Sequence, residues 1–298
     1  MTFMEIQHAR INSAVRNFVT KYADDDFFSI SDYKFLSKNP NRSPFFEKLL
    51  TMKNRRMHHL LLLSRLLLLE LKDEPTEISL PQIDEMFESH LISAETIEDS
   101  SFENNAEAKR CLTLLSLFYE IFKDDPMVIS GGGVQELKVE YFIISLYLLL
   151  RHLHSNYVFG KEQYPLFKEF VADFYQRWKK DDREDSLMIS FRDHRRHHKD
   201  DLETRDQIIR EMFFTKYPDL LRKDDKRAFN EAERIAIYRK GNGLCVICLK
   251  EGKTEKDALV PWKKYNADHA IAHSKGGITL PANAQVLCNH HNVQKGGK

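Results

Sequence analysis

The sequence predicts a mostly α-helical protein, with a large helical N-terminal domain over residues 1–225 and a small, differently built domain over residues 226–298. Apolar residues in the first part recur at the three- and four-residue spacing of amphipathic helices. The alternation of β-branched and polar residues that is typical of strands is scarce there. Three of the four cysteines lie at or after residue 245, where the helical pattern gives way to loops and short apolar pieces.

Helical spacing marks seven segments of the first domain: residues 4–23, 44–72, 79–91, 105–124, 131–157, 164–180 and 204–217. Segment 44–72 predicts one longer helix with a broad buried face. Segment 131–157 opens with a flexible turn at Gly131–Gly133 and is apolar on nearly all sides at its centre, which places it inside the bundle.

The stretch 179–206 is dense in charge and predicts a surface crossing between two helices. It contains His194, His197 and His198, which could suggest a metal site. No cysteine or fixed acidic partner accompanies them, so a solvated basic patch is the favoured interpretation.

The composition indicates a soluble protein without a membrane partner. Charged residues make up 30% of the chain and the mean hydropathy is −0.50. No stretch reaches the roughly 18 uncharged apolar residues that a spanning helix needs, since the best candidate carries Arg65 and Glu70. The N-terminus lacks the apolar core of a secretory signal, so we expect a cytoplasmic protein.

Charge is unevenly distributed along the chain. Residues 226–298 hold 13 Lys and Arg against 6 Asp and Glu, whereas the rest holds 32 against 39. This asymmetry favours a basic module that meets nucleic-acid phosphates, carried on an acidic body. Chance variation between segments is the alternative.

The second domain is expected to begin with a helix. Asn230 precedes it and Glu233 follows three positions later, which is the capping-box pattern, and Gly241 marks its end.

Two short cysteine motifs then predict a zinc site. Cys245 and Cys248 form one Cys-x-x-Cys knuckle, and Cys288 with His291 forms a second of the same spacing. Two such knuckles can close a tetrahedral Cys₃His site around a structural Zn²⁺. The alternatives are a redox Cys-x-x-Cys pair, which would leave the second knuckle unexplained, and buried cysteines without a metal. His290 competes with His291 as the fourth ligand, and the x-x spacing favours His291.

Between the knuckles, Asp268-His269 is followed by Gly276-Gly277, by Asn283 and, after the second knuckle, by Asn292. In order and spacing this string resembles the HNH endonucleases of the zinc-stapled ββα-metal (His-Me finger) kind. The resemblance covers about residues 228–297. It implies a small C-terminal ββα-metal (HNH) domain with a structural zinc.

The resemblance also implies the chemistry of DNA phosphodiester hydrolysis. His269 would be the general base for water, and Asp268 with Asn292 would hold a catalytic Mg²⁺ or Mn²⁺. Asn283 would bridge the loop and help to hold the His269 ring through a backbone contact. Gly276-Gly277 would turn the chain back so that Asn283 reaches this region. The expected products are a 5′-phosphate and a 3′-hydroxyl.

Four lysines could meet DNA phosphates, although each alone is an ordinary candidate for a solvated surface lysine: Lys263, Lys264, Lys275 and Lys295. His273 could also contact phosphate, but an exposed loop residue is the favoured interpretation.

The helical region is similar to that of GmrSD-like bacterial defence nucleases, which implies a role in restriction or phage defence. The N-terminal Asp-Gly-Gln-Gln-Arg signature of those nucleases is not in this chain. The helical domain could sense a target, form a homodimer or dock a partner protein.

Two other functions remain open. The C-terminal domain could be a zinc-stapled nucleic-acid-binding module without catalysis. Alternatively, the chain could be a toxin nuclease that its acidic helical half regulates, in which case residues 226–298 alone would be the more active form.

Overall fold

The computed structural model describes residues 2–10, 12–29, 34–92, 102–124, 137–180 and 184–296. The predicted Gly131–Gly133 turn lies outside them. The chain divides into a helical unit, Met1–Arg151 with Gln163–Pro218, and a C-terminal unit, His152–Glu162 with Asp219–Lys298. The division therefore falls before the predicted boundary at residue 225, and it assigns the short stretch His152–Glu162 to the C-terminal unit.

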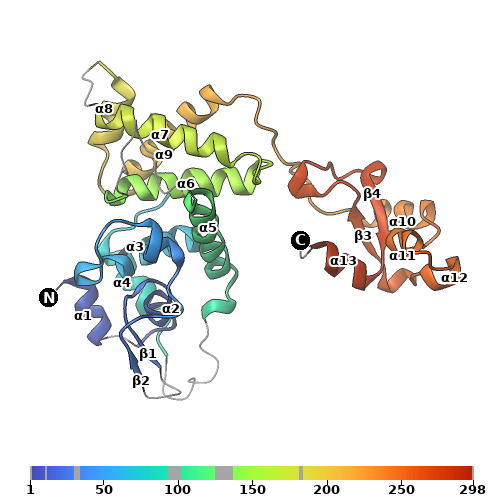
Figure 1. The fold of residues 1–298 in the computed structure, drawn as a ribbon, viewed down its shortest axis with the longest axis horizontal. Helices are drawn as coiled ribbons and strands as arrows, with labels where there is room; N and C mark the ends of the chain where they lie inside the picture. The colour runs from blue at the N-terminus through green and yellow to red at the C-terminus, as the bar shows by residue number, and fades with distance from the viewer. Residues whose placement is uncertain are drawn as a thin grey trace. The chain divides into compact units, whose positions relative to one another are not determined.

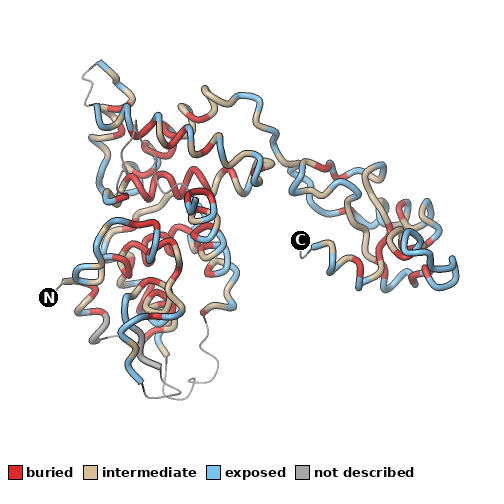
Figure 2. Tube along the Cα trace, in the orientation of Figure 1, coloured by how far each residue is buried: buried red, intermediate tan, exposed pale blue. Residues whose placement is uncertain are grey.

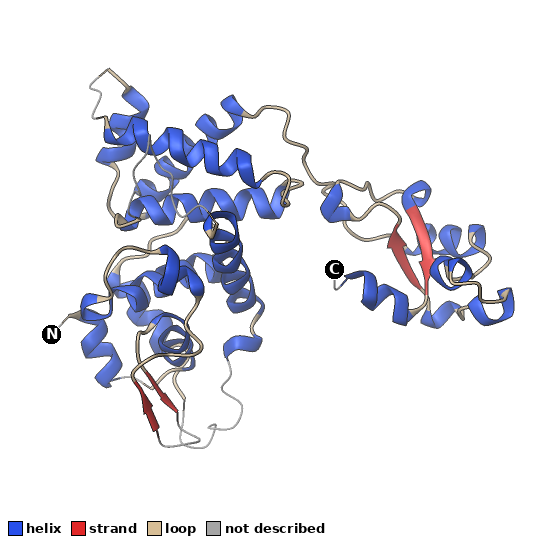
Figure 3. Ribbon diagram, in the orientation of Figure 1, coloured by secondary structure: helices blue, strands red, loops and turns tan. Residues whose placement is uncertain are grey.

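The helical unit is mostly α-helix, as the sequence predicts (Figures 1 and 3). Its helices are α1 (Phe3–Arg10), α2 (Ala14–Ala23), α3 (His58–Lys72), α4 (Leu80–Glu88), α5 (Ala106–Phe122), α6 (Glu140–Asn156), α7 (Tyr164–Lys179), α8 (Ser186–Asp193) and α9 (Lys199–Lys216). Helix α6 runs on into the C-terminal unit at His152.

The core of the helical unit lies around α3 and α6 (Figure 2). Helix α3 packs against α2, α4 and α5, and most of its leucines are buried. The centre of α6 is buried from Phe142 to Leu150, which confirms its predicted place inside the bundle.

Two charged residues within the apolar stretch of α3 are buried beside partners. Arg65 pairs with Glu140, and Glu70 accepts hydrogen bonds from Tyr147 Oη (2.9 Å) and Arg110 Nε (3.2 Å). Buried charges need such partners, because an unpaired one would be costly.

No described helix has the length and apolarity that crossing a membrane requires.

Two segments that the sequence presents as continuous helix are interrupted. Residues 44–72 contain a π-helical turn (Phe45–Leu49) and a 3₁₀ turn (Arg55–Met57) before α3, so the prediction of one long helix was wrong. The left-handed φ values of Arg56 (54°) and Met57 (62°) break the helical hydrogen-bond ladder. Residues 4–23 split into α1 and α2, where the Ser13 hydroxyl caps α2 by accepting from Arg16 N.

The helical unit also contains a hairpin that the sequence did not predict. Strands β1 (Phe27–Ser29) and β2 (Lys34–Leu36) pair antiparallel over three positions. At this length, alternation is too brief to be recognised in a sequence.

The surface crossing predicted for residues 179–206 was wrong in part, because it contains helix α8. The Asp185 carboxylate caps α8 by accepting from Met188 N (3.2 Å), and Met188 and Phe191 are buried. These two buried side chains dock the helix, although the flanking sequence is dense in charge. Helix α9 begins at Lys199, earlier than the predicted residue 204.

The C-terminal unit is a small two-stranded sheet with short helices around it. Its main elements are α10 (Glu231–Lys240), α11 (Val246–Lys250), α12 (Glu255–Ala258), β3 (Asn266–His269), β4 (Ala284–Leu287) and α13 (Asn289–Gly296). Short 3₁₀ turns occupy Trp262–Lys264, His273–Lys275 and Pro281–Asn283. Strands β3 and β4 pair antiparallel, with Asp268 opposite Gln285 and His269 opposite Ala284, and α13 packs against both strands.

The predicted entry helix is confirmed as α10. Asn230 Oδ1 accepts from Glu233 N and Glu233 Oε2 accepts from Asn230 N, both at 2.9 Å, so the capping box is complete. Gly241 caps the other end, where its amide donates to Ile237 O (2.9 Å). The Tyr265 hydroxyl donates to Arg234 O (2.6 Å) and ties α10 to the start of β3.

Candidate metal centre and reaction site

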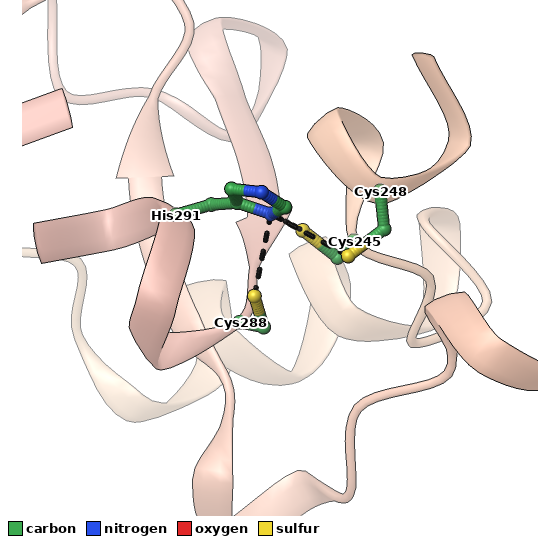
Figure 4. A group of neighbouring side chains, drawn as sticks. All are labelled: Cys245, Cys248, Cys288 and His291. Atoms are coloured by element: carbon green, nitrogen blue, oxygen red, sulfur yellow. Dashed lines mark hydrogen bonds between the residues drawn. The ribbon is translucent and has the colours of Figure 1, made fainter. Parts of the chain in front are cut away.

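Cys245, Cys248, Cys288 and His291 come together as one cluster (Figure 4). Their ligand atoms lie within 4.8 Å of one another. His291 Nδ1 is 3.3 Å from Cys245 Sγ and 3.4 Å from the sulfurs of Cys248 and Cys288. His290 is exposed and outside the cluster, so the knuckle spacing selected the correct histidine.

The cluster fits a tetrahedral ion such as zinc. With Zn–S near 2.3 Å and Zn–N near 2.0 Å, a tetrahedron separates sulfur from nitrogen by roughly 3.5 Å, close to the distances found here. No further group of three or more His, Cys, Asp or Glu side chains with this arrangement occurs in the described ranges. Four protein ligands leave no open position, so the site suits a structural ion.

The pKa values of the cysteine thiols also indicate that the cluster favours the binding of a cation. Burial raises the pKa of Cys245, but hydrogen bonds from the backbone amides of Cys248 and Cys288 and from the His291 ring outweigh it and bring that pKa to about 6. Burial and the adjacent thiols raise the pKa of Cys248 to about 11, because neighbouring thiolates repel. A divalent cation would offset this repulsion.

The local chain explains how the four ligands meet. Cys245 caps α11 and Cys248 lies within it, so one short helical turn presents both sulfurs. Cys288 follows β4 directly, and His291 lies one turn into α13. The ion would therefore join α11, β4 and α13.

The Glu251 carboxylate is a partner of this cluster that the sequence did not reveal. Its Oε1 lies 3.1 Å from His291 Nε2, the ring nitrogen that faces away from the sulfurs. Such a carboxylate holds the ring in the tautomer whose Nδ1 can bind metal. Glu251 follows α11, and nothing in the knuckle spacing indicates that it reaches α13.

His269 is half-buried at the end of β3. Its ring packs on Phe229 with the ring centroids 4.8 Å apart, and its Nε2 lies 2.9 Å from Thr279 Oγ1. Burial and then the neighbouring His273 lower the pKa of His269 below its usual range. The ring is therefore a neutral imidazole near pH 7, which can accept a proton.

The Asp268 side chain faces β4 and α13. Its Oδ2 accepts from Gln285 Nε2 (2.9 Å) and from the ammonium of Lys295, which also donates to the backbone carbonyl of His269. Asn292 lies one turn before Lys295 on α13 and so shares a face of that helix with it. Lys295 was expected among the phosphate contacts, but here it is an internal partner of Asp268.

Asn283 secures the loop that follows β3 rather than the His269 ring itself. Its Oδ1 accepts from Ile271 N (2.9 Å), and its Nδ2 donates to the carbonyl oxygens of Ile271 (3.1 Å) and Ile278 (3.0 Å). Its backbone carbonyl accepts from Ala270 N (2.8 Å). The His269 ring instead has its hydrogen-bond contact with Thr279, which the sequence did not single out.

The predicted glycine turn is confirmed. Gly276 has the left-handed φ of 82° that favours glycine. A Cβ on Gly277 would stand 1.8 Å from Ile271 O, so only glycine fits that position. His273 is half-buried and its Nε2 lies 2.7 Å from Asp224 O, so the expectation of an exposed loop histidine was wrong.

The remaining lysines lie on the surface. Lys263, Lys264 and Lys275 are exposed, and none takes part in an ion pair found among the described residues. Lys263 and Lys264 follow Trp262, which is 39% exposed and packs against Tyr238 and Tyr265.

Comparison with family models, with curated proteins and with solved structures gave no match for this chain.

Proposed function

We propose that this chain is a metal-dependent endonuclease of the HNH type, which hydrolyses DNA phosphodiester bonds. The observation that carries the proposal is the environment of β3. It presents a neutral histidine, His269, directly after a carboxylate, Asp268, that faces the final helix α13. A general base and a cation ligand on successive positions of one strand suit phosphate-ester hydrolysis.

In this proposal His269 takes the proton of the attacking water. Burial keeps its imidazole neutral at physiological pH, and Phe229 and Thr279 hold the ring in one orientation. General base catalysis contributes about 10²- to 10⁴-fold to the rate.

Asp268 and Asn292 would hold the catalytic Mg²⁺ or Mn²⁺. Their oxygens are the hard donors that these ions prefer, and the pair leaves positions for water and for phosphate. The Lys295 ammonium pairs with Asp268 and donates to the His269 carbonyl, so it would have to move aside before the metal ion binds there. The bound ion would stabilise negative charge on the phosphate and on the departing oxygen.

The zinc cluster would be structural. It would bind α11 and β4 to α13, and so keep α13 beside β3. A position in bacterial restriction or phage defence, suggested by the resemblance of the helical region, is part of the proposal.

The test is cleavage of supercoiled plasmid DNA by the full chain in the presence of Mg²⁺ or Mn²⁺. Wild type should convert the plasmid to nicked or linear forms, and His269→Ala should reduce the rate by about 10²-fold or more. His58→Ala is the matched control, because it removes an exposed imidazole from the helical unit. Equal rates for wild type and His269→Ala would exclude His269 as the base.

A second candidate is a zinc-stapled nucleic-acid-binding module without catalysis. The ion pair of Lys295 with Asp268 favours it, since an ammonium already neutralises the carboxylate proposed as the metal ligand. This candidate predicts salt-dependent binding of DNA with no cleavage of DNA or RNA by wild type under any divalent ion.

A further inference from the structure

Thr279 lies between His269 and the segment that leads into the C-terminal unit. It is only 1% exposed. Its hydroxyl donates to the backbone carbonyl of Lys226, and the same oxygen lies 2.9 Å from His269 Nε2.

The protons of this contact can be counted. A threonine hydroxyl carries one hydrogen, which here goes to the Lys226 carbonyl. The Thr279 oxygen can then only accept from His269, so Nε2 of the ring carries the proton. A neutral imidazole has one ring proton, which leaves Nδ1 with the free lone pair.

We propose that Thr279 is the positioning residue that fixes the tautomer of His269, so that Nδ1 is the atom that accepts the proton of the attacking water. The proposal rests on the function proposed above and names the reacting atom of that site. Thr279 acts through His269 and does not itself touch the reacting atoms.

The proton path balances. As the water oxygen bonds to phosphorus, a water proton moves to Nδ1. Nε2 keeps its own proton and continues to donate it in the hydrogen bond to the Thr279 oxygen. The bond from phosphorus to the 3′ oxygen breaks, and solvent water protonates that oxygen. The imidazolium then returns the proton taken at Nδ1 to solvent.

Thr279 is itself held in place by the segment before α10. Asp224 Oδ2 accepts from the Thr279 amide (2.5 Å), and the Asp224 carbonyl lies 2.7 Å from His273 Nε2. The amides of Thr279 and Lys226 lower the pKa of Asp224, so this anchor stays charged at neutral pH. Thr279 is thus held at two points, its backbone amide and its side-chain hydroxyl. A residue that only filled space would not require both contacts.

The experiment compares full-length wild type with Thr279→Val, which keeps the shape and removes the hydroxyl, and with Thr279→Ser, which retains it. Ser274→Ala is the matched control, because it removes an exposed hydroxyl from the same loop. The ring nitrogens are observed by ¹⁵N NMR of histidine-labelled protein at a pH where the imidazole is neutral, with His269→Ala to assign them.

The expected wild-type signature is a protonated Nε2 whose hydrogen exchanges slowly with solvent, and an unprotonated Nδ1. In Thr279→Val the Nε2 hydrogen should exchange rapidly with solvent, because its hydrogen-bond acceptor is gone. The loss of this one hydrogen bond should lower kcat about tenfold and leave KM for DNA unchanged. Thr279→Ser and Ser274→Ala should both resemble wild type.

Two results would overturn the proposal. One is a wild-type ring that carries its proton on Nδ1, which is decisive even if Thr279→Val fails to fold. The other is a folded, zinc-loaded Thr279→Val that keeps the wild-type signature and kcat. If wild type shows the expected signature but cleaves nothing, the Thr279 contact stands and the nuclease function fails.

Discussion

At the scale of single residues, Glu251 has a role that can be measured apart from any activity. It accepts from the ring nitrogen of His291 that faces away from the sulfurs. Glu251→Ala should weaken zinc binding by about 10- to 100-fold, because the ring loses the partner that orients it. Competition with a chromophoric chelator measures the affinity. Glu255→Ala, an exposed glutamate on α12, should leave the affinity unchanged.

His197 makes the helical unit sensitive to acid. Burial and then Arg65 lower the pKa of His197 to about 4, and its Nδ1 has no hydrogen-bond partner within the described part of the chain. The folded pKa lies below the unfolded value near 6.5, so the unfolded state binds more protons between these values. The free energy of unfolding should therefore fall as the pH drops from about 6.5 to 4.

Urea unfolding of full-length protein, followed by helical circular dichroism at several pH values, tests this. His197→Asn should show a weaker loss of stability over that range. An identical pH dependence in both proteins would assign the effect to other groups.

The residues that could be predicted from the sequence are those fixed by short spacing. The two x-x spacings identified all four members of the metal cluster and preferred His291 over His290. Glu251 and Thr279 could not be found in this way, because each meets its histidine only after distant elements have folded together. Ordinary polar residues carry no pattern that announces such a contact.

At the scale of elements, the loop from Ile271 to Ile278 depends on Gly277, where a side chain has no room. A methyl group on Gly277 would overlap the carbonyl of Ile271 and crowd the Asn283 amide, so the loop would have to move. Gly277→Ala should destabilise the C-terminal unit by about 2–4 kcal/mol and slow plasmid cleavage at least tenfold.

Hydrogen exchange of the Ile271 amide, which Asn283 protects in wild type, reports the loop directly. Gly296→Ala is the control, since a Cβ there meets nothing within 4 Å. Unchanged protection of Ile271 in Gly277→Ala would mean that the loop tolerates the methyl group.

Helical periodicity predicted where helices occur but not where they are interrupted. The long apolar face of α6 and the capping box of α10 each allow only one prediction, a helix at that place, because the local pattern and the observed burial or capping agree. The breaks at Ser13 and at Arg56-Met57 occur inside apolar patterns that would also suit continuous helix. Tertiary packing decided these cases.

At the scale of the whole molecule, the two units should differ in their dependence on metal. The described core of the C-terminal unit is a small cluster that includes Cys245 and Cys248 themselves, whereas the helical unit buries a large apolar interior. A strong chelator, or Cys245→Ser, should unfold the C-terminal unit and leave most of the helical signal intact.

Limited proteolysis with zinc analysis distinguishes the outcomes. Cleavage within residues 226–298 should appear first after chelation, while the helical unit persists. Retention of stoichiometric zinc by Cys245→Ser would show that Cys245 is not a ligand of the metal and that the cluster is not the zinc site.

The segment that leaves the helical unit ends inside the proposed reaction site. Val158 N donates to Leu221 O (2.8 Å) and Lys223 N to Asn156 O (2.8 Å), and Asp224 then binds Thr279 and His273. A fragment that begins at residue 226 would lose this brace. Under the proposed nuclease function, it should therefore be less active than the full chain rather than released from inhibition. A version of this domain that is transferred to another protein should therefore include residues 219–225, because they are part of the folded unit and not a passive linker.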